Sequence, residues 1–150
     1  MLKRLAFAAV GAAVVLTGLA ANAQTTERSA LFESLSRNGV RVVMGTSSKL
    51  CARRPGLQGY YLPSTRTITL CPKGHEPWDT LKHEAWHAVQ HCWGGAVLTD
   101  GTSELFPALR KLGYPEHELF TEADARIAEE VLNGYQVAEW LTRACAPFNR

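Results

Sequence analysis

The chain has 150 residues, with 16 lysines and arginines against 14 aspartates and glutamates, and its formal net charge is +2. Lys3 and Arg4 account for that excess, and both lie in a leader that we expect to be removed. The remaining charges balance, so the sequence indicates neither a nucleic-acid-binding protein nor one that binds an anionic membrane surface.

Residues 1–23 have the features of a secretory signal peptide. A basic start precedes an apolar run over residues 5–19, and "ANA" at 21–23 supplies the small residues that signal peptidase reads. The run is shorter than the roughly 20 apolar residues of a membrane helix. We therefore predict a signal peptide over 1–23 and a single domain over 24–150. That domain should be secreted or periplasmic, with no membrane segment after cleavage.

The hydrophobic pattern and the glycine and proline positions predict an α+β fold that is mainly helical, with a small N-terminal sheet or hairpin. Helices are expected at residues 26–37, 77–93, 103–112, 115–132 and 135–145. A short strand is expected at 40–44. The stretch "GYYLPSTRTITLC", residues 59–71, predicts a β-hairpin that turns at its proline and serine.

All four cysteines lie in the exported part of the chain, and an even number in an oxidising compartment predicts two disulfides. Of the three possible pairings we favour Cys51–Cys71 with Cys92–Cys145, because each bridge then joins neighbouring elements. A zinc–thiolate site is the alternative, but no two of the cysteines have C-x-x-C spacing.

The stretch "LKHEAWHAVQHCWGG", residues 81–95, contains the H-E-x-x-H pattern of zinc sites. Histidines at i and i+4 of a helix project in nearly the same direction, so His83 and His87 can bind one ion. Glu84 is one step round the helix, where its carboxylate can hold a water without being a ligand. The alternative is a helix that has histidines for no functional reason. His91 lies a further turn, about 6 Å, along the axis, and is expected to be a surface or hydrogen-bonding residue.

A third zinc ligand must come from another element, and the helix expected at 115–132 is rich in carboxylates. Its apolar face is expected to comprise Leu119, Phe120, Ala123, Ile127 and Val131. Glu122 flanks that face and is the favoured ligand, since it would complete a two-histidine, one-glutamate catalytic zinc site. Glu118 and Asp124 are the alternatives, followed by His117 and His75.

These residues carry a resemblance to a known family. "TLKHEAWHAVQHCWGG" followed by "FTEADARIAEEV" resembles the gluzincins, the thermolysin-like zinc metallopeptidases, and particularly their minimal, single-domain secreted bacterial members. The resemblance implies a zincin-like fold, with an H-E-x-x-H helix packed against a helix that carries a glutamate ligand. It implies Zn²⁺ as cofactor, His83, His87 and Glu122 as metal ligands, and Glu84 as general base.

The resemblance also implies a peptide or protein substrate, paired as an extended strand with the strand that ends at Cys71. Tyr60 and Tyr61 are candidates to line that cleft. The chain departs from the family at residue 126, where Arg126 stands four residues after Glu122 in place of an acid. Candidates to stabilise the transition state are His117, Tyr114 and Tyr135.

Two functions of other classes remain open from the sequence. One is a zinc-binding protein without catalytic activity, secreted as an interaction or inhibitory module. The other is a structural protein that is stabilised by its disulfides and contains H-E-x-x-H by chance.

Overall fold

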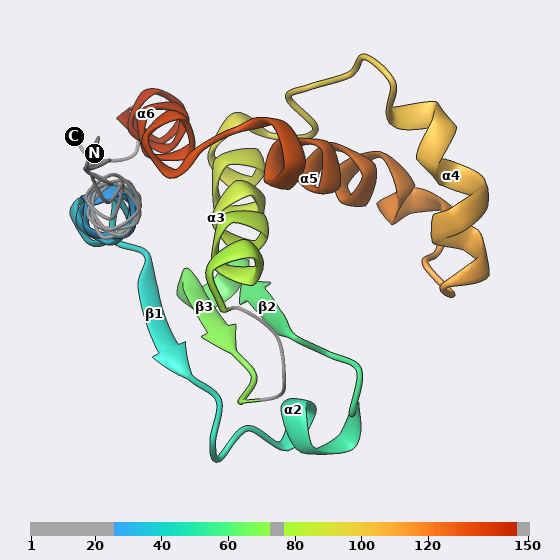
Figure 1. Ribbon diagram of the computed structural model, residues 1–150, viewed down its shortest axis with the longest axis horizontal. Coiled ribbons are helices and arrows are strands. Elements are labelled where there is room, and N and C mark those ends of the chain that lie inside the picture. Colours follow the sequence, from blue (N-terminus) through green and yellow to red (C-terminus); the bar gives the residue numbers. More distant parts are fainter. Residues whose placement is uncertain (1–25, 73–76, 147–150) are drawn as a thin grey trace, which may run out of the picture.

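Helix α3 (Pro77–Trp93) is the central element of a computed structural model that describes residues 26–72 and 77–146. The helices α5 (Leu119–Val131) and α6 (Gly134–Cys145) both pack against α3, as does the sheet, and α4 (Thr102–Lys111) packs against α5 (Figure 1). The predicted signal peptide over 1–23 and the candidate ligand His75 lie outside the described residues.

Helix α3 ends at a pair of glycines, as the sequence predicts. Gly94 has φ 91°, a backbone conformation that a glycine adopts without steric cost. The amides of Gly94 and Gly95 both donate to the carbonyl of Gln90, at 2.8 and 3.0 Å, so the last turn is closed by hydrogen bonds.

The sheet is small and mixed. Strands β1 (Arg41–Met44), β2 (Gly59–Leu62) and β3 (Thr67–Leu70) lie in the order β1-β3-β2. The β2–β3 pair is antiparallel and turns through a short 3-10 helix (Pro63–Thr65), so the predicted hairpin is confirmed. The parallel pairing of β1 with β3 and the short helix α2 (Lys49–Arg53) were not predicted.

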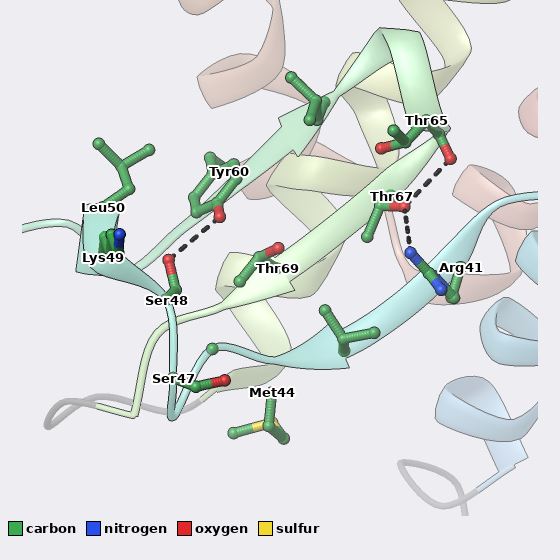
Figure 2. Close-up of a pocket in the computed structure, with 13 residues that line it drawn as sticks. Arg41, Met44, Ser47, Ser48, Lys49, Leu50, Tyr60, Thr65, Thr67 and Thr69 are labelled. Atoms are coloured by element: carbon green, nitrogen blue, oxygen red, sulfur yellow. Dashed lines mark hydrogen bonds between the residues drawn. The ribbon is translucent and has the colours of Figure 1, made fainter. Parts of the chain in front are cut away.

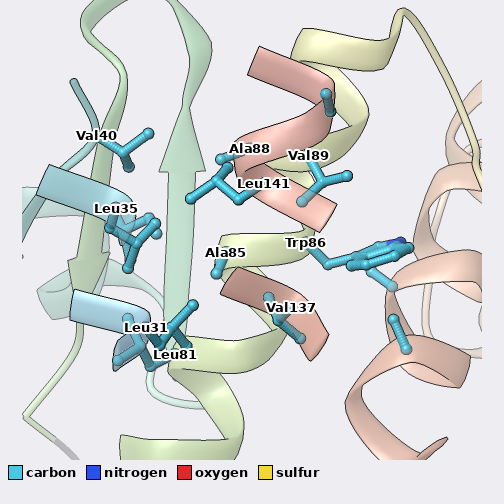
Figure 3. Close-up of a cluster of buried hydrophobic side chains, with 14 of the residues drawn as sticks. Leu31, Leu35, Val40, Leu81, Ala85, Trp86, Ala88, Val89, Val137 and Leu141 are labelled. Carbon is cyan, nitrogen blue, oxygen red and sulfur yellow. The ribbon is translucent and has the colours of Figure 1, made fainter. Parts of the chain in front are cut away.

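One main core fills the space between the helices and the sheet. Side chains from residues 26–37, which are helical, pack there with α3 and α6 (Figure 3). The buried members include Leu31, Leu35, Ile68, Leu81, Ala85, Trp86, Ala88, Val89, Val137 and Leu141. Helix α3 is therefore buried by neighbours on most of its surface, and His83 and His87 lie on the side that packs against α5.

The buried face of α5 differs from the predicted one. Phe120 and Val131 are 54 % and 62 % exposed, whereas Asp124, Ala125 and Ala128 are fully buried. Small side chains on this face let the backbones of α3 and α5 approach closely, and that rotates the larger apolar residues outward. The helix also begins later than expected, because residues 116–118 form a separate 3-10 turn.

Both predicted disulfides are present. Cys51–Cys71 joins α2 to the end of β3, and Cys92–Cys145 joins the C-terminal ends of α3 and α6. Among the described residues no cysteine is free. Of the helices in this part of the chain, none combines the length and the apolar character needed to cross a membrane.

Candidate metal centre

His83 and His87 converge on Glu122, as the spacing along α3 predicts. The Nε2 atom of His83 lies 3.6 Å from Glu122 Oε2, and the Nε2 atom of His87 lies 3.4 Å from Glu122 Oε1. One ligand atom from each of the three side chains can be chosen so that all lie within 4.8 Å of one another. The three side chains are only 12–17 % exposed, and together they form a group that could hold a metal ion.

The chemistry of Glu122 fits a bound cation. Its Oε2 atom is buried and has no hydrogen-bond partner among the described residues. Burial raises the pKa of Glu122, but the adjacent imidazoles of His83 and His87 lower it well below its ordinary value. The carboxylate is therefore ionised, with Oε2 next to the His83 ring and Oε1 next to the His87 ring. Two imidazole nitrogens and one carboxylate oxygen are a common donor set for catalytic zinc.

Each histidine is oriented by a second partner on its other nitrogen. Nδ1 of His83 lies 3.1 Å from Glu129 Oε2, and Nδ1 of His87 lies 2.8 Å from Gln90 Oε1. An amide or carboxylate oxygen only accepts, so each Nδ1 carries the proton. In the neutral rings the Nε2 lone pairs then point toward Glu122, which is the tautomer that a metal requires.

Asp124, one of the alternative ligands, is instead a structural residue. It is fully buried and accepts hydrogen bonds from Gln90 Nε2 at 2.7 Å and from the amides of Val97 and Leu98 at 2.8 Å each. These bonds fasten the loop after α3 to α5. They also hold Gln90, and through it His87, in place.

The other alternative ligands lie on the surface. The Glu118 side chain is 48 % exposed and its Oε1 atom lies 3.6 Å from Nε2 of His117, which is itself 80 % exposed. Neither residue belongs to the group formed with His83 and His87. His91 is also exposed, and its Nδ1 lies 2.9 Å from the hydroxyl of Tyr61, so it is the hydrogen-bonding residue that we expected.

Glu84 lies beside the ligand group without belonging to it. Its side chain is buried and accepts a hydrogen bond from the backbone of Tyr61. Burial raises the pKa of Glu84 above its ordinary value, although the neighbouring His87 and His83 lower it in part. A carboxyl group with a raised pKa next to a metal-binding group suits proton transfer.

Strand β2 approaches Glu84 closely because Gly59 has no side chain. A Cβ atom at Gly59 would lie 2.7 Å from Thr80 Cγ2, 3.0 Å from the Thr69 carbonyl oxygen and 3.3 Å from Glu84 Cγ. Since β3 is paired on both sides, the expectation that the strand ending at Cys71 offers a free edge is wrong. The free edge nearest Glu84 belongs to β2.

A cavity of about 170 Å³ opens beside His83 and Glu84. It is also lined by residues 56–59 and by Thr80, Tyr114, Arg126 and Glu129. Tyr60 and Tyr61 are absent from its lining. That they line the cleft of an extended peptide stays a prediction. Of the three candidates to stabilise the transition state, Tyr114 lines this cavity and the other two do not. His117 and Tyr135 are exposed on the surface.

A larger cavity of about 530 Å³ lies on the opposite face of the sheet (Figure 2). Successive strand residues point to opposite faces. Tyr60, Thr67 and Thr69 therefore face this cavity, while Tyr61 and Ile68 face α3. None of the candidate ligands lines it.

The sequence did not identify the partners that orient the histidines. Glu129 follows Glu122 by seven residues, two helical turns, and that spacing was the available signal for it. Gln90 follows His87 by three residues on the same helix face. Arg126 occupies the position where the resemblance leads one to expect an acid, and Glu129 contacts the first histidine instead.

The chain was also compared with known proteins. It matches no protein-family model, no curated protein and no solved structure.

Substitutions on α5 should separate a ligand from its neighbours. Glu122→Ala removes one of three donors, so zinc affinity should fall by more than the roughly 10- to 100-fold typical of losing a ligand's hydrogen-bond partner. Glu129→Gln should cause a loss within that smaller range. Glu118→Ala is the matched control and should bind zinc as the wild type does. Competitive titration with a chelator measures all three, and unchanged affinity in Glu122→Ala would refute this ligand set.

The metal-free protein should lose stability at mildly alkaline pH. Burial alone would lower the pKa of His83. The carboxylates of Glu122 and Glu129 raise it by more than burial lowers it, so the pKa is about 9. The free histidine has a pKa of about 6.5, so the charged ring stabilises the fold fully below about pH 6.5 and ceases to do so as pH rises through about 9. One pKa unit corresponds to about 1.4 kcal/mol, so the loss should amount to a few kcal/mol.

Chemical unfolding in the presence of a chelator, between pH 6 and 9.5, measures this effect. The pH dependence should become smaller in His83→Gln, which leaves only the part due to His87. Burial lowers the pKa of His87, but Glu122 raises it overall above its ordinary value. The full pH dependence should persist in His91→Gln, which alters an exposed histidine of the same helix. Equal pH dependence in the two variants would show that His83 is not the titrating group.

Proposed function

We propose that the protein is an exported zinc metallopeptidase that hydrolyses peptide bonds. The observation that carries the proposal is the convergence of His83, His87 and Glu122, with the unpartnered Oε2 of Glu122 among them and Glu84 alongside. The signal-like sequence at residues 1–23 and the two disulfides support export, because disulfides persist in oxidising compartments.

The three side chains would hold Zn²⁺, and the metal would supply Lewis acidity, which polarises a carbonyl group and lowers the pKa of water. Glu84 would take a proton from the attacking water and deliver it to the leaving nitrogen. The water oxygen is added to the carbonyl carbon, the C–N bond breaks, and one carboxyl group and one amine are released. Glu129 and Gln90 would keep the two imidazoles in the tautomer that binds metal.

An extended peptide would bind along the free edge of β2. Among the described strands β2 pairs only with β3, so backbone groups on its outer edge are available for strand addition, apart from the Tyr61 N–H. Glu84 accepts the backbone N–H of Tyr61 from that strand, so the general base would lie beside the bound peptide. The absence of a side chain at Gly59 allows this close approach.

Glu84→Gln tests the proposed chemistry. The amide is isosteric with the acid but cannot accept the proton, so hydrolysis should fall by about 10²- to 10⁴-fold while zinc binding is kept. Glu130→Gln is the matched control, since Glu130 is exposed on α5. Cleavage of a mixture of unstructured peptides is followed by mass spectrometry, and zinc content by metal analysis.

Three other outcomes would contradict the proposal. Loss of zinc in Glu84→Gln would show that Glu84 is a ligand. A wild type that holds zinc but cleaves nothing would be a binding protein without catalytic activity. A wild type that takes up no zinc would be a structural protein stabilised by its disulfides.

A further inference from the structure

The cavity beside Glu84 contains a basic group that the proposed hydrolysis does not use. Arg126 lines it, and of the described residues in that lining Arg126 alone carries a permanent positive charge. We infer that Arg126, assisted by Tyr114, binds the terminal carboxylate of a peptide, so that the substrate is a free carboxyl terminus. The inference rests on the proposed function and specifies its substrate class.

The guanidinium of Arg126 is incompletely satisfied. Its Nε atom is buried and has no hydrogen-bond partner among the described residues. No described carboxylate forms an ion pair with it within 4.0 Å. A planar carboxylate matches the forked donors of arginine in two parallel hydrogen bonds.

Tyr114 supplies a second donor at the same place. Its ring packs against the small cluster of Leu109, Leu119 and Ala123, and its amide bonds the carbonyl of Leu109, so the side chain is held. Its hydroxyl lies near the Arg126 guanidinium and the Glu122 carboxylate, both of which act on it electrostatically. The hydroxyl can therefore donate to an anion bound by Arg126.

The order of residues on α5 places the arginine beside the metal-binding group. Arg126 follows Glu122 by four residues and precedes Glu129 by three, so the three side chains share one side of the helix. Glu122 and Glu129 contact His83, and Arg126 projects into the cavity that His83 and Glu84 also line. An anion on Arg126 would thus lie close to the bond that is cut.

The small cavity suits the end of a peptide better than a large ligand. Its volume is about 170 Å³, below the roughly 300–1,000 Å³ typical of pockets for larger ligands. We therefore expect the terminal residue of a peptide there, with its carboxylate on Arg126. Each turnover consumes one water, breaks the last C–N peptide bond and releases one free amino acid.

The charges in the cavity link carboxylate binding to the metal. The acidic residues Glu84 and Glu129 line it together with the cationic Arg126. A divalent ion on the Glu122 group adds positive charge beside them. An anionic terminus should then bind with less electrostatic cost than in the metal-free protein.

The test compares N-acetyl-trileucine with its C-terminal amide. Binding of each is measured by calorimetry on zinc-loaded Glu84→Gln protein, and again on the same protein without metal. The acid should bind the zinc-loaded protein about 10- to 100-fold more tightly than the amide, the range expected for hydrogen bonds to a charged group. Adding Arg126→Met should remove this preference. Adding Arg126→Lys should restore only part of it, because lysine cannot form two parallel bonds.

Arg143→Met is the control, because Arg143 is exposed on α6 and pairs with Glu139. The melting temperature and zinc affinity of each variant are measured in parallel, so that a misfolded protein is recognised. In the wild type, mass spectrometry should show residues released one at a time from the free carboxyl terminus and little cleavage of the amide.

Two outcomes overturn the inference. Equal affinity for the acid and the amide, both with and without metal, would show that no carboxylate subsite exists. A preference for the acid that survives Arg126→Met would assign the carboxylate to the metal instead. Failure of zinc uptake or of all hydrolysis is a separate result that contradicts the proposed function, so the two failures are distinguishable.

Discussion

The packing of α5 against α3 is the contact on which both the core and the metal-binding group depend. Small residues such as Ala125 and Ala128, which belong to the same buried cluster as the core residues of α3, let the two helices approach closely, and that approach brings Glu122 to His83 and His87. A larger side chain at either alanine would separate the helices and pull the carboxylate away from the imidazoles. Metal affinity and helix packing are therefore coupled through the same interface.

This interface also contains buried charge, which needs partners. Asp124 is fully buried, but three hydrogen bonds satisfy its oxygens and connect α5 to Gln90 and to the loop after α3. Removing one partner of such a group is strongly destabilising, whereas the intact set fixes one arrangement of the helices. The structural carboxylate thus sets the geometry in which the neighbouring Glu122 can act as a ligand.

Features determined by local chemistry could be read from the sequence. The glycine pair predicted the end of α3, and the i, i+4 histidines of that helix converge. The even cysteine count predicted two disulfides, and the pairs chosen because they join neighbouring elements are confirmed. The choice of Glu122 over Glu118 and Asp124 agrees with the geometry, although it drew on a family resemblance.

Features that depend on how the helices are rotated against one another could not be predicted from the sequence. Phe120 and Val131 looked like core residues because they are apolar, yet close helix packing favoured the smaller side chains and buried Asp124 instead. The same rotation decides which acid meets the first histidine, so Glu129 was missed. Strand β1 pairs with a strand distant in sequence, and no turn between them signals that pairing.

The most direct test of the metal site is a crystal of the zinc-loaded protein, measured at the zinc absorption edge. Anomalous difference density should show one peak at about 2.0–2.2 Å from Nε2 of His83, Nε2 of His87 and a carboxylate oxygen of Glu122. No peak at that position, or a zinc ion bound by other residues, would contradict the proposed centre.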